Sequence, residues 1–388
     1  MSKSKFMEKL LEGAEIKWKT LGEMLVRTKG TKITAGQMRE LHKDGAPVKI
    51  FAGGKTVAFV NYADIPSKDI NNEPSIIVKS RGVIEFEYYD QPFSHKNEMW
   101  SYHAKKPVIN IKYAYHFLKL NEAHFQKIGG KMQMPQIATP DTDKFLIPIP
   151  YPENTDKSLE IQSKIVRILD TFTELTTELT AELTARKKQY SYYCDQLMSF
   201  EEGEVEWKTL GEVSSNLDSM RRPITTGLRE PGDIPYYGAS GIVDYVKGYI
   251  FDGDFLLVSE DGANLVARNT PIAFSVSGRS WVNNHAHVLK FDTYAERRYI
   301  EYYLNSIDLT PYISGAAQPK LNKKNLENIS VPNPSLKEKE RIVTILDKFD
   351  ALTTSISEGL PREIELRQKQ YEYYRDLLLS FSKSNIAV

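Results

Sequence analysis

The side chains that could do chemistry in this chain are concentrated in a few polar stretches. "GRSWVNNH" (278–285) offers an arginine, a tryptophan and two asparagines, and "QPKLNKKN" (318–325) offers a glutamine, three lysines and two asparagines. "VKSRG" (78–82), "FSHKN" (93–97) and "GGKMQMPQ" (129–136) have the same character. Arginine and lysine can pair with guanine, and asparagine and glutamine with adenine, in the major groove of DNA. Taken singly, each stretch can equally be a solvated loop.

Motifs for catalysis are missing from the sequence. It contains no G-x-x-x-x-G-K-[ST] loop, no G-x-G-x-x-G opening a helix, and no Asn-Pro-Pro-Tyr or Asp-Pro-Pro-Tyr tetrapeptide of the methyltransferase type. His285 and His287 have no partner at metal-ligand spacing, and "SEDGAN" (259–264) lacks the glutamate that a calcium loop carries six positions on. The single cysteine, Cys194, excludes an internal disulfide framework and a multi-thiolate metal site. The sequence therefore favours binding over catalysis, and we expect no metal.

Composition places the chain among soluble, folded proteins. Its 388 residues, 41% of them hydrophobic, suffice for two or three domains with real cores. No run of 18 apolar residues occurs and the first residues lack a signal-peptide pattern, so we expect a cytoplasmic protein without membrane contact. The net charge of zero argues against indiscriminate binding to nucleic acid. It combines an excess of five positive charges in residues 14–155 with an excess of five negative charges in residues 201–335.

The sequence contains a long internal repeat. Three segments recur at long and nearly constant offsets. "WKTLGE" occurs unchanged at 18–23 and 207–212. "IVRILDTF" at 165–172 returns as "IVTILDKF" at 342–349, with six of eight residues identical, and "RKKQYSYYCDQLMSF" at 186–200 returns as "RQKQYEYYRDLLLSF" at 367–381, with ten of fifteen identical. The chain is therefore a tandem duplication.

Between the strong repeats lie two regions, called heads below, that resemble each other only faintly. "VKIFAGGKTVAFV" (48–60) aligns with "IPYYGASGIVDYV" (234–246), and "IKYAYHFL" (111–118) with "RRYIEYYL" (297–304). This order predicts five segments: an N-terminal helical segment at 1–13, a first head at 14–155, a helical spacer at 156–200, a second head at 201–335 and a second spacer at 336–388.

Local patterns in the heads predict mixed α and β structure. Runs of alternating or continuous apolar residues predict strands at 75–80, 83–89, 255–260 and 287–291, and amphipathic runs predict short helices at 111–120 and 295–305.

The spacers carry the heptad seam of a coiled coil. Apolar residues follow Ile161 at alternating steps of four and three, and the second copy repeats the pattern from Ile342. Each seam needs a cover, so we expect the two spacers to pack antiparallel. "ELTTELTAELTA" (174–185) repeats one helical turn and includes a stutter at Leu179–Leu183. In the second copy "EGLPR" (358–362) predicts a helix stop and restart.

The order of a head, "IVRILDTF" with "RKKQYSYYCDQL", a head, and "IVTILDKF" with "RQKQYEYYRDLL" resembles the DNA-specificity subunit of type I restriction-modification systems over essentially the whole chain. The resemblance implies an α+β fold: two mixed α/β target-recognition domains separated by two long antiparallel coiled-coil regions. Each domain would read one half of a split, asymmetric site on double-stranded DNA.

The same resemblance implies a subunit that is not itself an enzyme. Two modification subunits would dock on the helices, bind S-adenosylmethionine and methylate adenine. Restriction motor-nuclease subunits would complete the complex, with ATP and Mg²⁺ bound in the partners and no cofactor in this chain.

These considerations single out two sets of residues. The expected DNA contacts are Lys55, Lys79, Arg81, His95, Lys96, Lys131, Gln133, Gln136, Ser240, Arg279, Trp281, Asn283, Asn284, Gln318, Lys320 and Lys323. The expected subunit-interface residues are Tyr190, Tyr193, Leu197, Phe200, Tyr371, Tyr374, Leu378 and Phe381. Two alternatives stay open: a two-headed coiled-coil scaffold that binds proteins and not DNA, and an enzyme with an unrecognised site.

Overall fold

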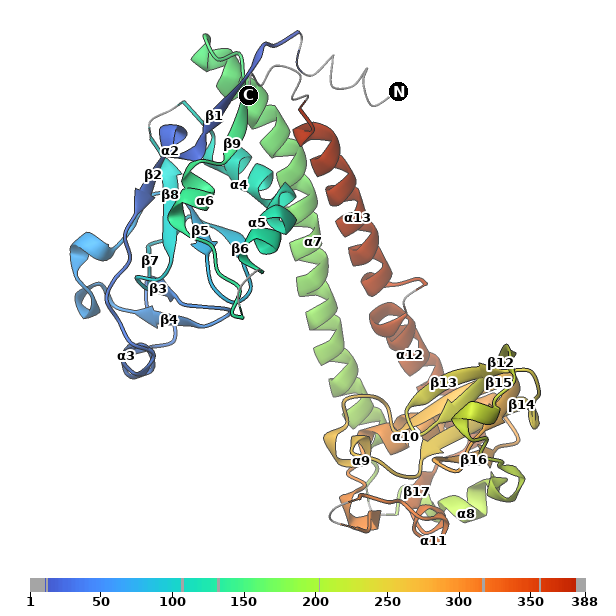
Figure 1. Cartoon of the computed structure of the whole chain (residues 1–388). Helices are drawn as coiled ribbons and strands as arrows, with labels where there is room; N and C mark the ends of the chain where they lie inside the picture. Colours follow the sequence, from blue (N-terminus) through green and yellow to red (C-terminus); the bar gives the residue numbers. More distant parts are fainter. Residues whose placement is uncertain are drawn as a thin grey trace. The chain divides into compact units, whose positions relative to one another are not determined.

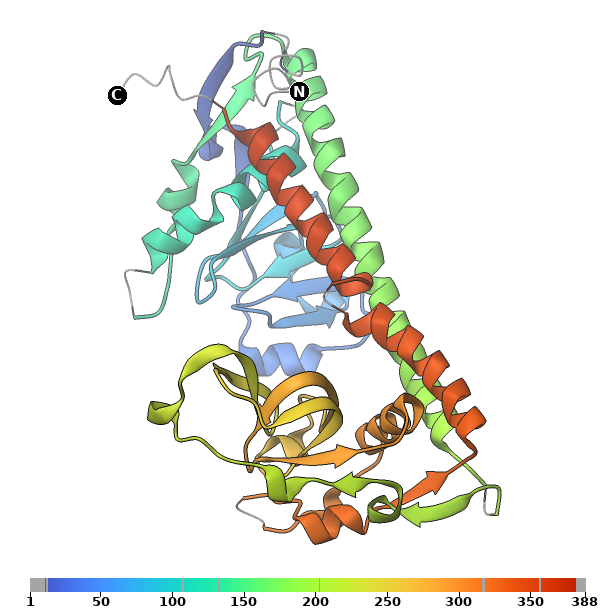
Figure 2. The same ribbon diagram turned by 90° about the vertical axis from the view of Figure 1, so that its right-hand side faces the viewer.

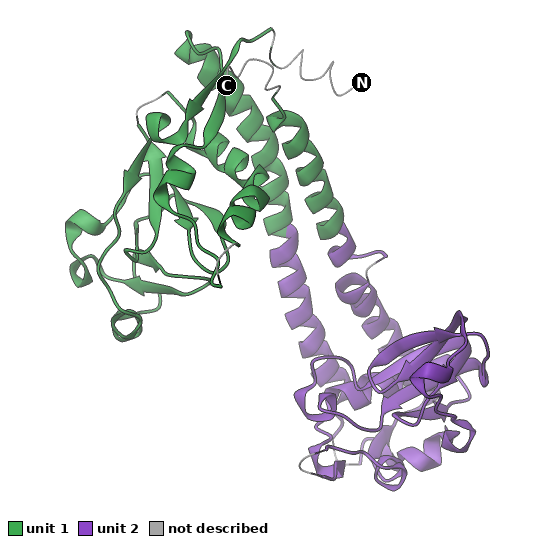
Figure 3. Ribbon diagram, in the orientation of Figure 1, with its two compact units in different colours: residues 1–178, 364–388 green, residues 179–363 purple. Residues whose placement is uncertain are grey.

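The computed structural model divides the chain into two compact units (Figure 3). Unit 1 combines residues 1–178 with 364–388, and unit 2 consists of residues 179–363. The structure describes residues 11, 13–105, 108–130, 133–201, 203–315, 318–355 and 357–381. Among the helices within these ranges, none is long and apolar enough to cross a membrane.

The first head, in unit 1, is a mixed α/β body (Figure 1). Its strands are β1 (Ile16–Thr20), β2 (Leu25–Thr28), β3 (Val48–Phe51), β4 (Val57–Val60), β5 (Ser75–Lys79), β6 (Glu85–Tyr89), β7 (Phe93–His95), β8 (Trp100–Ala104) and β9 (Leu146–Pro150). Its helices are α2 (Leu21–Met24), α3 (Ala35–Leu41), α4 (Ile111–Leu120), α5 (Glu122–Gly129) and α6 (Thr139–Asp143), with short 3-10 turns η1 (Tyr62–Asp64) and η2 (Ser67–Asp69). The strands form a four-stranded sheet in the order β2-β8-β5-β6, a three-stranded sheet β4-β3-β7, and the pair β1-β9.

The second head, in unit 2, repeats this plan. Its strands are β10 (Glu206–Thr209), β11 (Ser215–Asn216), β12 (Pro231–Gly238), β13 (Gly241–Val246), β14 (Phe251–Ser259), β15 (Ala273–Val282), β16 (Ala286–Lys290) and β17 (Ser330–Asn333). Its helices are α8 (Leu210–Val213), α9 (Asn264–Ala267), α10 (Tyr294–Ser306) and α11 (Lys323–Glu327), with 3-10 turns η3 (Asp218–Met220), η4 (Thr226–Leu228) and η5 (Thr310–Tyr312). The pair β10-β17 matches β1-β9, and the remaining strands form one sheet in the order β11-β16-β14-β15-β12-β13.

One local difference explains why the first head has two sheets where the second has one. The hairpin β3-β4 adds to β7 in parallel, as the hairpin β12-β13 adds to β15. In the second head β15 is a single strand of ten residues that carries both partners. In the first head the corresponding stretch is interrupted at Asp90, Gln91 and Pro92 between β6 and β7. Proline has no N–H to donate to a strand neighbour, so the ladder stops there.

The elements predicted from sequence pattern are confirmed with small shifts at their ends. The expected strands at 75–80 and 83–89 are β5 and β6, and those at 255–260 and 287–291 are β14 and β16. The two expected helices are α4 and α10. Asn110 caps α4 by accepting the N–H of Lys112 and Tyr113, and Thr293 caps α10 by accepting the N–H of Glu296. Polar caps therefore fix where both helices begin.

Most of the described residues of the two spacers are helical. The first is α7 (Thr155–Met198), and the second is split into α12 (Leu336–Thr354) and α13 (Leu360–Leu379). The expected stop and restart is confirmed: Gly359, with φ of +92°, directly precedes α13, and Pro361 lies in its first turn. A side chain at position 359 would be strained at this φ and would meet the Ala351 carbonyl oxygen 2.4 Å from its Cβ.

Within each unit, helices from the two repeats cover one another in antiparallel fashion (Figures 1 and 2). In unit 1, Phe172 of the first repeat stacks on Tyr374 of the second, with ring centroids 5.1 Å apart. In unit 2 the equivalent residues exchange roles, and Phe349 of the second repeat contacts Tyr193 of the first at 5.4 Å. The expected antiparallel packing of the seams is thus present in each unit, and each head is completed by a helix from the other repeat.

The four-residue repeat behaves differently from the rest of α7. None of the side chains at 174–185 is buried, although Leu175, Leu179 and Leu183 are partly covered. By contrast, Ile165 and Leu169, nine and five residues before Glu174 on the same helix, are fully buried. This stretch contributes helix length and little core, because burial of apolar surface is what anchors a helix to its surroundings.

This reciprocal packing predicts that a cavity in the last helix destabilises the first head. Leu378 is fully buried in the hydrophobic core of unit 1 together with Ile76 of β5. Leu378→Ala should lower the local stability of β5 by about 2–5 kcal/mol, the usual cost of such a cavity. Amide hydrogen exchange of β5 and β14 measures the effect in the two units separately. Leu346→Ala, from the same repeat but in the core of unit 2, should reverse the pattern. Equal losses in both strands would contradict this assignment.

Candidate nucleic-acid interface

Three loops meet at one edge of the first head. The loop after β5 (80–82), the loop between β7 and β8 (96–99) and the segment 133–137 are joined mainly through their backbones. The N–H of Gly82 donates to the carbonyl oxygen of Pro135 at 2.9 Å, and the N–H of Ile137 donates to Ser80 at 3.0 Å. The hydroxyl of Ser80 donates to the carbonyl oxygen of Glu98 at 2.7 Å. These bonds fix the loops against each other.

The second head builds the same frame from different residues. The N–H of Gly262 donates to the carbonyl oxygen of Pro319 at 3.2 Å. The N–H of Leu321 donates to the backbone carbonyl oxygen of Glu260 at 2.8 Å. The N–H of Glu260 donates to the carbonyl oxygen of His285 at 2.9 Å, in the place of the Ser80 bond. Gly82 and Gly262 both have positive φ, +78° and +103°, so the same tight turn follows β5 and β14.

Side chains on this shared frame differ in charge between the heads. In the first head Arg81 forms an isolated β-bridge with Gln136, and in the second Asp261 forms the equivalent bridge with Lys320. Arg81, Gln136 and Lys320 are exposed, and Asp261 is partly exposed. One backbone arrangement therefore presents a cation and an amide in one head, and a carboxylate and a cation in the other.

The structure brings several of the expected DNA contacts to these loops and leaves others elsewhere. Lys55 and Ser240 stand in the turns of the equivalent hairpins β3-β4 and β12-β13, and Arg279 lies in β15 over the ring of Tyr249, with Asp252 opposite. Trp281 donates its indole N–H to the carbonyl oxygen of Arg222 at 2.6 Å. The expected residues with exposed side chains are Lys55, Arg81, Gln133, Gln136, Ser240, Arg279, Asn284, Gln318, Lys320 and Lys323, while Lys96 and Trp281 are partly buried. Lys131 lies outside the described residues.

Three of the expected contacts do not reach the surface. Lys79 is 7% exposed and pairs with Glu85 and Glu87, at 2.5 and 2.9 Å. His95 is fully buried, and burial lowers the pKa of its imidazole. Asn283 is 6% exposed and accepts the N–H of His285 with its side-chain oxygen at 2.8 Å. These three side chains therefore lie beneath the surface of the head and pack under the exposed loops.

Asp261 is a residue that sequence reasoning missed. Its carboxylate lies 2.8 Å from Nδ1 of His285, so the two loops of the second head also pair through side chains. An alignment of "KSRG" (79–82) with "SEDG" (259–262) would have placed Asp261 opposite Arg81. The two segments share only their glycine, which is why the match is weak in sequence.

A buried ion network supports the second head's loops. Arg221 contacts Glu260 at 2.5 Å, Lys320 contacts Glu260 at 3.1 Å, and His287 contacts Asp218 at 2.6 Å. The other ring nitrogen of His287 lies 2.7 Å from the carbonyl oxygen of Leu321.

Asp218, Glu260 and His287 are close enough to hold a metal ion, but both nitrogens of His287 and the Glu260 carboxylate already have partners. Burial opposes ionisation of Glu260, yet hydrogen bonds from Arg221 and Lys320 and the charge of His287 outweigh it and lower its pKa. The group is thus a self-compensated network that holds Lys320 in place.

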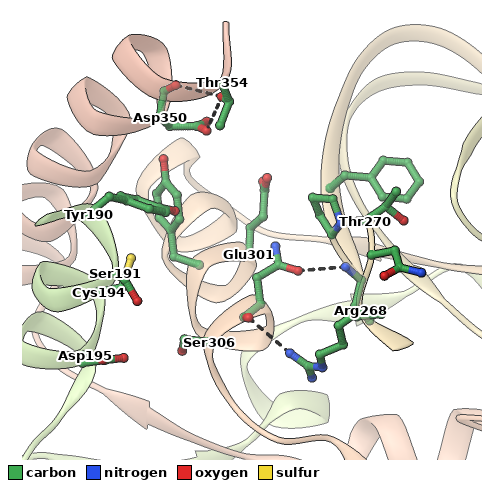
Figure 4. A pocket seen from close by; sticks show the side chains of 16 residues that line it. Tyr190, Ser191, Cys194, Asp195, Arg268, Thr270, Glu301, Ser306, Asp350 and Thr354 are labelled. Atoms are coloured by element: carbon green, nitrogen blue, oxygen red, sulfur yellow. Dashed lines mark hydrogen bonds between the residues drawn. The ribbon is translucent and has the colours of Figure 1, made fainter. Parts of the chain in front are cut away.

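A cavity of about 580 Å³ lies between the end of α7 and α10, entirely within unit 2 (Figure 4). Its lining includes Tyr190, Cys194, Arg268 and Glu301. Burial raises the pKa of the Cys194 thiol to about 11 and also raises the pKa of the Glu301 carboxyl. The thiol therefore stays protonated near neutral pH, which makes it a poor nucleophile.

The residues expected to bind partner subunits divide into two groups. Tyr371 and Leu378 are buried in unit 1, and the ring of Tyr374 is stacked on Phe172, so these side chains hold the chain together. Tyr190, Leu197, Phe200 and Phe381 are partly buried, and Tyr193 is 37% exposed.

The most exposed aromatic side chains of the spacers are Tyr192 and Tyr373, 60% and 59% exposed, which stand at equivalent positions of the repeat. The sequence contained a signal for them: a duplicated tyrosine off the apolar seam.

Comparison with known proteins agrees with the duplicated architecture. A model of the "Type I restriction modification DNA specificity domain" matches residues 16–186 and again residues 202–366. The chain is 36% identical to the EcoR124I/EcoR124II specificity subunit of Escherichia coli, over 99% of this chain and 98% of the relative. It is 32% identical to the EcoprrI specificity subunit of Escherichia coli, over 92% and 93% of the two chains.

Among solved structures, the S subunit of a type I restriction-modification system from M. genitalium has the same fold. It aligns with a TM-score of 0.66 at 17% identity, over 96% of this chain and 98% of that one. Two family matches, one per repeat, and two relatives aligned over nearly their full length lead to one conclusion. The chain belongs to the family of DNA-specificity subunits of type I restriction-modification systems.

Proposed function

We propose that this chain reads a bipartite, asymmetric DNA site, one half-site per head, and docks the adenine methyltransferase and restriction subunits of a type I complex. The observation that carries the proposal is the three-loop frame, which recurs in both heads with its exposed charges changed. A protein that reads two different half-sites needs the same presentation of loops with different functional groups. Family membership supports the coarser role, specificity for DNA sequence.

The exposed groups on the frame suit base edges in the major groove. In the first head Arg81 can pair with the O6 and N7 atoms of guanine, and Gln136 with the N6 and N7 atoms of adenine. In the second head Lys320 can approach guanine and Asp261 can accept from the amino group of cytosine. Each good bidentate pair is worth about 1–3 kcal/mol of discrimination, so a single substitution should relax one position of the site.

Charge argues for partners in DNA binding. The second head has five more acidic than basic residues, and its Lys320 is already paired with Glu260. Affinity for DNA comes largely from cations near phosphates, so this head depends on basic surfaces that partner subunits supply. We propose that those partners also bind S-adenosylmethionine, ATP and Mg²⁺, and that the complex works in the cytoplasm, where its DNA is.

Exchange of one head tests the division of labour. Replacing residues 14–155 by the first head of another family member should change one half-site and leave the other intact, because each three-loop frame is built within its own unit. Methylome sequencing of cells that carry the complete system reads both half-sites at once.

A change in both half-sites would show that the heads do not read independently. The scaffold alternative is tested with the parental chain in a gel shift on random duplex DNA, with and without its methyltransferase partner. No shift in either lane would favour a scaffold that never touches DNA.

Deletion of one repeat unit tests whether α7 sets the gap between half-sites. Removing Glu182–Ala185 shortens the helix by about 6 Å and changes its phase by about 40° beyond a full turn. One base pair corresponds to about 3.4 Å and about 35° of DNA twist. Helix tilt can absorb excess length, whereas a head out of rotational phase misses the groove. We therefore expect the same half-sites with a gap one base pair shorter.

The matched control keeps the helix length and changes its side chains: Glu182→Ala with Leu183→Ala and Thr184→Ala should leave the gap unaltered. Methylome sequencing of both strains beside the parent gives the comparison. If the deletion strain kept the parental gap, the repeat would be no more than tolerated helix.

Substitution of the exposed tyrosines tests docking. Tyr192→Asp with Tyr373→Asp should weaken association with the methyltransferase subunits at least tenfold, because two large aromatic surfaces on the spacers would carry charge. Analytical ultracentrifugation of the mixture measures the assembly. Tyr62→Asp, at an exposed tyrosine of the first head, is the control and should assemble normally. Unchanged assembly of the double variant would remove both residues from the interface.

A further inference from the structure

In each head one helix makes a charged contact with the spacer, and both of these contacts end on the same residue of the repeated motif. That residue is Asp170 in "IVRILDTF" and Asp347 in "IVTILDKF". The contacting helices are α4 in unit 1 and α10 in unit 2. Each contact lies wholly within its own unit.

In unit 1 the Asp170 carboxylate receives a lysine and a histidine. Nζ of Lys112 lies 2.7 Å from one carboxylate oxygen, and Nε2 of His116 lies 3.1 Å from the other. The second ring nitrogen of His116 lies 3.1 Å from the hydroxyl of Tyr371, which comes from the other repeat. The imidazole is 1% exposed and the carboxylate 20% exposed, so water screens this contact poorly.

In unit 2 the Asp347 carboxylate receives an arginine and two tyrosines. Nη2 of Arg298 lies 2.9 Å from one oxygen, and the hydroxyl of Tyr302 donates to the same oxygen at 2.6 Å. The hydroxyl of Tyr294 donates to the other oxygen at 2.7 Å. Arg298 is 12% exposed on its side chain, and its charge is shared further with Glu301 at 2.6 Å and with Asp350 at 3.0 Å.

The two contacts are the same device built from different donors. The alignment of 111–118 with 297–304 places Lys112 at the position of Arg298 and His116 at the position of Tyr302. Residues four apart lie on one face of a helix. Each head therefore presents a cation and, one turn later, a second hydrogen-bond donor to the carboxylate. The head residues changed as the heads diverged, and the accepting carboxylate did not.

The energetics set this contact apart from ordinary surface ion pairs, which contribute little to stability. Burial opposes ionisation of Asp170, but the hydrogen bonds from His116 and Lys112 outweigh it and lower its pKa. Hydrogen bonds to a charged group contribute more than neutral ones. A head that turns on its spacer has to break these bonds, so the contact opposes rotation.

We propose that Asp170 and Asp347 are positioning residues that fix the rotational setting of each head on its spacer, and through it the gap length that the chain accepts. This rests on the proposed function, in which the two heads read separate half-sites. A duplex with a gap one base pair too long or too short forces a head to turn, and the broken carboxylate contact is the cost that rejects it. In this role the two carboxylates act through Lys112 and Arg298 and require no contact of their own with DNA.

The test measures gap preference separately from half-site preference. Asp170→Asn, Asp347→Asn and the double variant are assembled with the methyltransferase partner. Methylation is followed on duplexes with the parental gap and with one base pair more or less. Each single variant should lose about tenfold of the parental preference for the correct gap, the equivalent of one charge-assisted hydrogen bond, and should keep its half-sites. Glu178→Gln, an exposed carboxylate-to-amide change on the same helix, should behave as the parent.

A donor transplant separates positioning from simple loss of stability. Lys112→Arg with His116→Tyr gives the first head the equivalents of Arg298 and Tyr302, two of the three donors of the second head, and should keep the gap preference. Lys112→Ala with His116→Ala should lose it. Parental gap preference in both asparagine variants would overturn the proposal, as would an equal loss in the transplant and the alanine pair. If the parent itself preferred no gap, the proposed function would fail first, which distinguishes the two outcomes.

Discussion

The backbone hydrogen bonds that join three loops at one edge of each head are the constraint on which the rest of the structure depends. They use only N–H and C=O groups and one serine, so they tolerate almost any side chain around them. Recognition of a base needs donors and acceptors held within a few tenths of an ångström, and loops alone are too mobile for this. Tying each loop to the next provides rigidity, and the side chains are left free to differ, as Arg81 and Asp261 do.

The helices solve a second problem, which is to hold two diverged heads on one scaffold. Each unit is completed by a helix from the opposite repeat, and the aromatic pairs Phe172–Tyr374 and Phe349–Tyr193 exchange roles between the units. Buried residues that hold the fold are concentrated near the heads, whereas the stretch 174–185 between them has none. A change of helix length within this stretch would therefore remove no fully buried side chain from either core.

Much of this architecture could be predicted from the sequence, because internal repetition and period are long-range signals. The duplication, the heptad seam of the spacers and the helix break at Gly359 were all predicted from the residue types and their spacing. Burial within the heads was not, because it depends on which strands pair. Lys79 and His95 look like surface residues in their stretches. Lys79 is covered by its partners on β6, and His95, on β7, is covered by the loops that contact this strand. Tyr373 is exposed because it lies off the apolar seam. The heptad spacing alone was enough to separate it from the buried seam residues.

The reciprocal composition of the units has a consequence for synthesis on the ribosome. Residues 364–381 close the core of the first head, where Leu378 and Leu379 pack with Ile165 and Leu169. Translation of the 185 residues between the two parts, 179–363, takes about 9–37 s at 5–20 residues per second. During that time the first head has emerged with one apolar face uncovered. Of the two units, the one that begins the chain is therefore the one that finishes folding last, and in a crowded cell its open face is the part of the nascent protein most in need of a chaperone.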